Sequence, residues 1–142
     1  MCVTSGVAVN WPTPDTAPAS PAIDSVTANG DVLTMTFRQG TPAFEIAQQA
    51  DAHFTKDPSG QPVTLAGTAG AKITLRGFRG DLQNYTGGSS ISSSGGVLLQ
   101  VMEIGDSEGI VTWAVGASGA TCATVTSTGS SLTFHFIPQP GA

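Results

Sequence analysis

The chain has 142 residues, with 5 Lys and Arg against 10 Asp and Glu, giving a net charge of −5. This length suits one domain with a sizeable hydrophobic core, and the shortage of basic residues argues against nucleic acid or an anionic membrane surface as a partner. Charged residues make up 11 % of the sequence, whereas about 25 % is usual in soluble domains. Low charge combined with many Gly, Ser, Thr, Ala and Val residues indicates an exported β-protein.

Residues 1–21 contain four prolines among Thr, Ala and Ser. This composition predicts an extended, flexible tail that tethers a folded domain spanning residues 22–142. Trp11 is the exception in the tail, and we expect it to pack onto the domain because an exposed Trp leaves a large apolar area in water.

The two cysteines, Cys2 and Cys122, allow three interpretations, the simplest of which is that Cys2 is an incidental, unmodified residue. Cys2 directly after Met1 suits the lipidated residue of a bacterial lipoprotein, in which case a lipid anchor is the one predicted membrane contact. A Cys2–Cys122 disulfide is the alternative; it would suit an exported protein and tie the tail to the sheet.

The first strands are predicted from Ile23 to Thr27 and from Val32 to Phe37, with Leu33, Met35 and Phe37 on one face. Asn29-Gly30 between them is a strong two-residue hairpin signal. Residues 43–49 suit helix or strand, and we predict a strand because the neighbouring segments are strands.

The middle of the chain reads as loops between short strands. We predict a loop over 51–60, a brief edge strand over 63–65, a strand over 72–78 with Ile73 and Leu75 on one face, and a long Gly/Ser-rich loop over 80–96.

Residues 97–116 form the strongest strand pair, joined by the polar turn Asp106-Ser107-Glu108. Alternation places Leu98, Met102 and Ile104 on one face of the first strand. In the second strand it places Val111, Trp113 and Val115 on one face, with Trp113 as the largest single contribution to the core.

Two final strands are predicted over 122–126 and 132–137, with Leu132, Phe134 and Phe136 pointing inward. The whole series of about eight short strands separated by turns, with no convincing helix, predicts an all-β antiparallel sandwich.

No catalytic or metal-binding motif is evident. His53 and His135 stand in no metal-ligand spacing, so no metal and no cofactor are expected. His53 lies near Asp51, but no Ser has the sequence context of a nucleophile, and His135 is expected on a solvated sheet face.

Three carboxylates, Glu103, Asp106 and Glu108, are close in sequence. They could hold calcium or hydrolyse a glycan, but a polar turn whose carboxylates accept backbone N–H bonds is the simpler interpretation. Asp106 and Glu108 are kept as candidate ligand contacts.

Four further residues are candidates for contacting a sugar or an acidic ligand. Arg76, Arg79, Asn84 and Tyr85 cluster before the strand pair at 97–116 and combine charge, amide and aromatic groups. As a surface salt-bridge cluster they would stabilise the fold by less than ~1 kcal/mol. Asn84-Tyr85-Thr86 also matches a glycosylation sequon, a match that is common by chance.

Four sequence segments, PAFEI, DPSGQPVTLAG, LRGFRGDLQNYTG and EIGDSEGIVTWAVG, occur in an order and spacing that resembles the AMIN-like domain proteins of actinobacteria. The resemblance spans roughly Ile23 to Ile137. It departs from the family at Ser107, where an aromatic is usual, and in the last strand, where LTFHF replaces a basic–apolar–acidic pattern.

The resemblance implies a β-sandwich and a non-catalytic role in the cell envelope, since AMIN domains are thought to bind peptidoglycan or to localise partners. We therefore expect an exported, monomeric binding module for a cell-wall glycan. The alternatives are a module that binds another envelope protein through a sheet edge and a glycan hydrolase.

Overall fold

The computed structural model describes residues 7–10, 23–37, 42–56, 59–76, 90–107 and 110–138, and these form twelve β-strands. In chain order the strands are β1 Val7–Asn10, β2 Ile23–Asn29, β3 Val32–Phe37, β4 Ala43–Gln49, β5 His53–Thr55, β6 Pro62–Thr64, β7 Ala69–Arg76, β8 Ser90–Ser92, β9 Leu98–Ser107, β10 Ile110–Ala117, β11 Thr121–Thr128 and β12 Ser131–Pro138. The predicted all-β class is confirmed.

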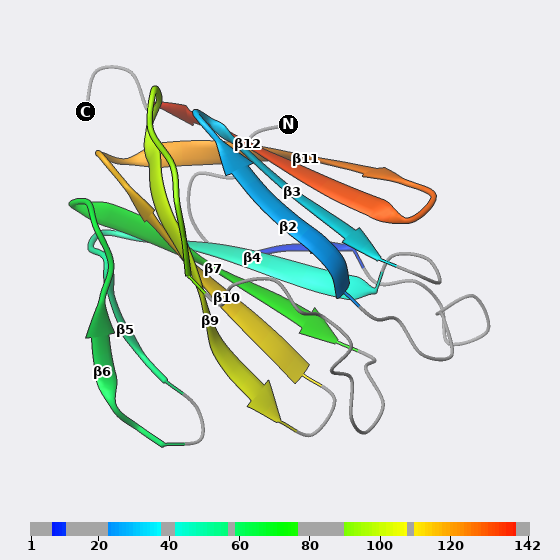
Figure 1. Cartoon of the computed structure of the whole chain (residues 1–142), viewed down its shortest axis with the longest axis horizontal. Helices are drawn as coiled ribbons and strands as arrows, with labels where there is room; N and C mark the ends of the chain where they lie inside the picture. The colour runs from blue at the N-terminus through cyan, green and yellow to red at the C-terminus, as the bar shows by residue number, and fades with distance from the viewer. Residues whose placement is uncertain are drawn as a thin grey trace.

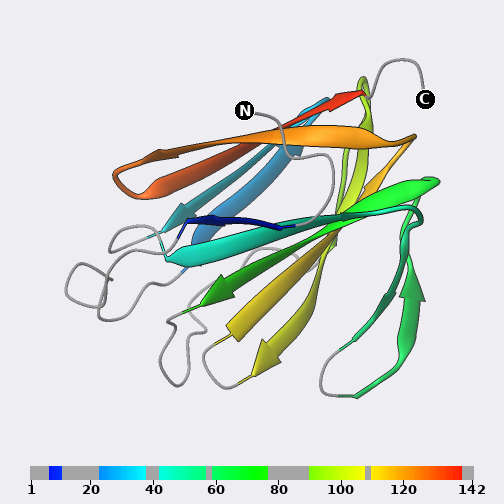
Figure 2. The same ribbon diagram turned by 180° about the vertical axis from the view of Figure 1, so that it is seen from behind.

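Two antiparallel sheets pack face to face (Figures 1 and 2). One has six strands in the order β1-β4-β7-β10-β9-β8, and the other has four in the order β11-β12-β3-β2. Strands β5 and β6 form a separate hairpin that projects beside β9 and β10 in Figure 1. The predicted antiparallel sandwich is therefore confirmed.

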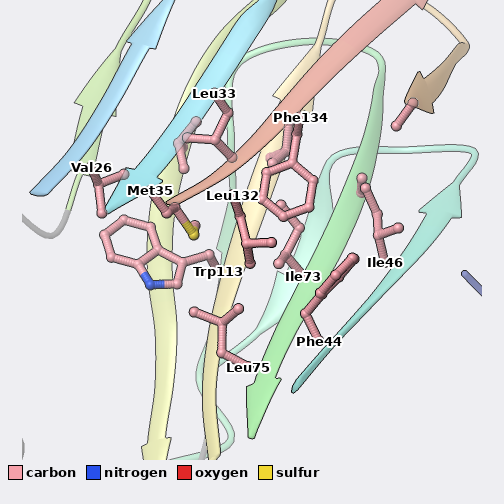
Figure 3. Close-up of a cluster of buried hydrophobic side chains, with 14 of the residues drawn as sticks. Val26, Leu33, Met35, Phe44, Ile46, Ile73, Leu75, Trp113, Leu132 and Phe134 are labelled. Atoms are coloured by element: carbon pink, nitrogen blue, oxygen red, sulfur yellow. The ribbon is translucent and has the colours of Figure 1, made fainter. Parts of the chain in front are cut away.

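The core lies between the two sheets and is built from alternate residues of the strands. Trp113, Phe134 and Phe136 are its largest fully buried side chains. Figure 3 shows Trp113 beside Val26 and Met35, which come from the opposite sheet. Trp113 is thus the largest buried side chain of the core, as the sequence predicted. Phe44 and Phe134 also meet across the sheets edge to face, with ring centroids 5.8 Å apart, the geometry that aromatic quadrupoles favour.

Strand β9 does not keep the alternation predicted from its sequence. Leu98 and Val101 both enter the main core, whereas Ile104 and Met102 pack on the other face of the sheet. Two register shifts interrupt the pairing with β10, and the one between Gly116 and Ala117 separates Leu98 from Val101 and Met102 on β9. Each bulge adds one unpaired residue and reverses the faces beyond it, so the prediction that Leu98, Met102 and Ile104 share a face is wrong.

Three short strands were not predicted. Within the predicted tail, residues 7–10 form β1, which pairs with β4, so the tail prediction is wrong for these four residues; the rest of the tail, including Trp11, lies outside the described residues. Strands β5 and β8 lie in segments predicted as loops. Each of the three has only three or four residues, too few for periodicity to reveal.

The β5–β6 hairpin covers part of the outer face of the six-stranded sheet. Phe54 and Leu65 pack with Ile104 and Ala114 in a second, smaller apolar cluster. Gly70 allows this close approach, because a Cβ there would lie 2.9 Å from the Phe54 ring and closer still to two backbone carbonyl oxygens. The hairpin therefore makes part of this outer face inaccessible to other contacts.

The turn between β2 and β3 joins the two sheets at one end of the sandwich. Residues 30 and 31 form the loop, with Gly30 at φ +66°, one residue later than the predicted Asn29-Gly30 pair. The Val97 N–H donates to Asp31 Oδ1 at 2.8 Å, and the Gly30 N–H donates to Ser93 Oγ at 2.9 Å. The turn of one sheet thus holds the loop that leads into β9 of the other.

Candidate functional site

Arg76 and the backbone of Asp106, two of the predicted ligand contacts, lie at one end of the six-stranded sheet. Arg76 ends β7, and the backbone register aligns it with Ile110 and Ser107 on the next two strands. At the backbone, Arg76 is therefore one strand spacing from Ile110 and two strand spacings, about 10 Å, from Ser107.

Arg76 is paired with a residue that the sequence did not single out. Its Nε donates to Glu45 Oε1 at 2.8 Å, and its terminal nitrogen approaches the same oxygen at 2.7 Å. The two side chains are 38 % and 24 % exposed. The ion pair is partly solvated. Because its guanidinium is bonded to Glu45 of β4, Arg76 mainly links the end of β7 to β4.

Most of the predicted ligand contacts lie outside the described residues. Arg79, Asn84, Tyr85 and Glu108 are in this group, and Asp106 is placed by its backbone alone. The structure therefore leaves these five assignments as predictions, and of the predicted set only Arg76 has a described side chain at this end of the sheet.

The histidine nearest to a carboxylate makes no catalytic pair with it. His53 Nδ1 bonds to Thr64 Oγ1 at 2.9 Å, across the β5–β6 hairpin. Asp51 Oδ1 instead accepts from the His53 backbone N–H at 3.1 Å and from Gln49 Nε2 at 2.9 Å. This carboxylate shapes the turn before β5. In the part of the chain that the structure describes, no group of three or more His, Cys, Asp or Glu residues could hold a metal ion.

Cys122 is buried in β11 and is disulfide-bonded. Cys2, the one other cysteine in the sequence, lies outside the described residues. Disulfides persist in oxidising compartments and are rare in cytosolic proteins.

The outer face of the four-stranded sheet carries an ordered array of hydroxyl groups that the sequence analysis did not identify. One row across the strands consists of threonines: Thr126, Thr133, Thr34 and Thr27 are successive register partners from β11 to β2. The row beside it reads Thr128, Ser131, Thr36 and Ser25 in the same strand order. We call these eight residues the hydroxyl face.

The hydroxyl face points away from the core because its residues alternate with buried ones. Leu33, Met35 and Leu132, each a neighbour of a hydroxyl-face residue, are fully buried between the sheets. The eight residues are half-buried on the inner strands and mostly exposed on the outer ones. Rows lie two residues apart along each strand, about 7 Å, and strands lie about 4.8 Å apart.

None of the eight residues is charged. Each hydroxyl both donates and accepts hydrogen bonds, and each threonine adds a methyl group. Ser25 Oγ and Thr36 Oγ1 bond to each other at 2.5 Å across β2 and β3, which shows that neighbours within a row are in hydrogen-bonding reach. The face is thus suited to a neutral partner rich in hydroxyl or amide groups.

No family model, no curated protein and no solved structure matches this chain. Within the described residues, no helix is long and apolar enough to span a bilayer.

The sequence did hold a signal for the hydroxyl face, although a partial one. Thr34-Met35-Thr36 and Thr124-Val125-Thr126 alternate hydroxyl with apolar residues, and so do three-residue stretches in β2 and β12. Alternation predicts which residues share a face of one strand. It does not predict that β12 lies between β3 and β11, and this pairing is what places the hydroxyls in rows.

Proposed function

We propose that the protein is an exported, non-catalytic binding module of the cell envelope, and that it holds a neutral stretch of a wall glycan on the hydroxyl face. The observation that carries the proposal is the pair of uncharged, in-register hydroxyl rows. A glycan presents repeated hydroxyl and amide groups, which these side chains can match without the cost of removing a charge from water.

Two further features support an envelope role. The disulfide-bonded Cys122 suits a protein that works in an oxidising compartment, and the resemblance to AMIN-like proteins implies the same location. The net charge of −5 favours an uncharged part of the wall polymer over its anionic groups, because like charges repel.

The proposal is tested by retention of the protein on purified, insoluble peptidoglycan. The test variant is the double substitution Thr34→Val and Thr133→Val, which removes the hydroxyls of two register partners and keeps the β-branched shape. We expect about tenfold weaker retention, since each lost hydrogen bond contributes about 0.5–1.5 kcal/mol.

The other sheet offers a matched control. Thr74 and Thr112 are also register partners on the outer face of adjacent inner strands, and both are half-buried. Replacing both with Val should leave retention at the wild-type level. If the wild-type protein is retained no better than an unrelated acidic protein, peptidoglycan is not the ligand; if both double variants lose retention equally, the hydroxyl face is not the site.

A further inference from the structure

The hydroxyl face is a strip that is longer across the strands than along them. Each row crosses β11, β12, β3 and β2, a length of three strand spacings or about 14 Å. Along the strands, the two rows are only about 7 Å apart. An elongated ligand therefore meets the most hydroxyl groups when it lies across the strands, parallel to the rows.

The strip is bounded on both of its long sides. The next row on the same face consists of Thr124, His135, Val32 and Asn29 in the same strand order. His135 and Val32 stand on the two inner strands, and neither carries a hydroxyl group, so the array stops there. On the other side, β11 ends at Thr128. The site is therefore two hydroxyls wide and four strands long.

Hydroxyl groups within a row can bind a ligand while they are bonded to each other. The bond between Ser25 Oγ and Thr36 Oγ1 uses one of the two O–H groups of this pair. The second O–H and the remaining acceptor sites of both oxygens can serve a ligand, since each hydroxyl has one donor and two acceptor sites. Such a bond also orders the side chains before binding, which lowers the entropy that binding costs.

Resting on the proposed function, we infer that the ligand is an extended, β-1,4-linked chain of sugars with equatorial hydroxyl groups, and that it lies across the strands with one sugar over each. One sugar of such a chain is about as long as the spacing between neighbouring strands, so chain and sheet stay in step from β11 to β2. Equatorial groups leave a β-1,4-linked chain along both of its edges, and the two rows match these two edges. Chains with α-1,4 or β-1,3 linkages coil and lose this match.

The twist of the sheet favours a single solvated chain over a crystalline polymer. Neighbouring strands of a sheet are rotated by about 20–25°, and Figure 2 shows β2 and β11 of this sheet running in different directions. A single chain can turn at each glycosidic bond and so follow the rows. The flat surface of a crystalline polymer would contact only part of them.

The test is displacement of the full-length wild-type protein from insoluble peptidoglycan by soluble β-1,4-linked N-acetylglucosamine oligomers of two to six sugars. Each added sugar up to the fourth should lower the concentration that displaces half of the protein by about fivefold, because it adds hydrogen bonds of ordinary strength. The fifth and sixth sugars should add only the statistical gain from extra binding registers, since β11 and β2 end the rows.

The linkage is tested with two glucose tetramers that differ in nothing else. Cellotetraose has β-1,4 linkages and should displace the protein. Maltotetraose has α-1,4 linkages, and we expect it to need an at least about tenfold higher concentration, which measures the specificity of the rows for an extended chain.

The placement on the rows is tested with Thr126→Val, which removes the hydroxyl at the β11 end of one row. The ratio of the half-displacing concentrations of trimer and tetramer should fall from about fivefold to below about twofold, because the trimer still reaches β12, β3 and β2. Thr124→Val is the matched control, since Thr124 lies on the same strand and face but beyond the two rows. This variant should keep the wild-type ratio.

The outcomes separate this inference from the proposed function. If the wild-type protein is not retained on peptidoglycan, the proposed function fails before any oligomer is added. If it is retained, three results overturn the inference alone: no displacement by the N-acetylglucosamine oligomers, no break in the length series at the fourth sugar, or equal effects of cellotetraose and maltotetraose. Equal ratios in Thr126→Val and Thr124→Val would also overturn it.

Discussion

Glycine at position 96 is required by the close approach of two loops. A Cβ there would overlap Asp31 Oδ1 and the backbone of Gly30, and both atoms are held in place by the bonds of the β2–β3 turn. Since backbone cannot move aside as a side-chain end can, the position tolerates no larger residue without opening the contact between the sheets.

The substitution Gly96→Ala should therefore lower the free energy of unfolding by about 3 kcal/mol, a value in the upper range for a point change that overpacks a rigid site. Urea unfolding followed by Trp fluorescence measures the difference. Gly119→Ala is the control, because no atom lies within 4 Å of the Cβ that it would add, and it should change stability by less than about 0.5 kcal/mol. Equal effects of the two substitutions would contradict the steric argument.

The Arg76–Glu45 ion pair is well formed but partly in water. In a double-mutant cycle with Arg76→Met and Glu45→Gln, we expect a coupling energy below about 1 kcal/mol, because solvent screens exposed pairs. The coupling should weaken further at high salt. A coupling of several kcal/mol that salt does not change would mean that the pair is more deeply buried in solution than in this structure.

At the scale of elements, the β5–β6 hairpin is attached to the sheet through few side chains. Phe54, 7 % exposed, is its main apolar contact with the second cluster. Such an element can open without unfolding the sandwich, since local stability follows local apolar burial.

Replacing Phe54 with Ala should cost up to about 3 kcal/mol, the lower end for a buried Phe because the site lies near the surface. Hydrogen exchange should rise in β5 and β6 while β7 and β10 keep most of their protection. Leu132→Ala, in the main core, is the comparison and should raise exchange in all strands. The expectation fails if Phe54→Ala also affects every strand equally.

The sequence predicted the long elements well and the short ones poorly. Strand β4 was predicted with its observed bounds, and the inward faces of β3, β10 and β12 are confirmed, because each keeps a clean two-residue period. β9 departs from the predicted alternation of faces because its bulges shift the two-residue period, and bulges depend on the partner strand. β1, β5 and β8 are set by tertiary pairing rather than by local pattern.

Tertiary strand pairing also accounts for the contacts at the candidate site that the sequence did not predict. Arg76 was identified as a charged residue near a loop, but its partner Glu45 is 31 positions away and is brought beside it by the β4–β7 pairing. The hydroxyl face needs the register of four strands from both ends of the chain. Neither relation is visible in any window of the sequence.

At the scale of the whole molecule, a measurement of intact mass shows whether Cys2 is disulfide-bonded or lipidated. We expect the intact mass of the protein to rise by two hydrogen masses on reduction, as a bond between Cys2 and Cys122 requires. Opening this bond should also lower the stability of the domain by about 5 kcal/mol, the chain-entropy value for so long a loop. A mass that is larger by one diacylglyceryl group and unchanged by reductant would contradict this expectation.

The pairing of β3 with β12 affects the order in which the protein folds during synthesis. Residues 32–36 cannot form their pairing with β12 until residues 131–135 have been synthesised, so the four-stranded sheet is among the last parts that a growing chain can complete. Contacts so distant in sequence also form slowly. Until β12 arrives, the β2–β3 hairpin has an open edge and an uncovered apolar face. A product truncated before β12 would hence lack both the complete sheet and the hydroxyl face, so the proposed binding surface is present only once β12 has been synthesised.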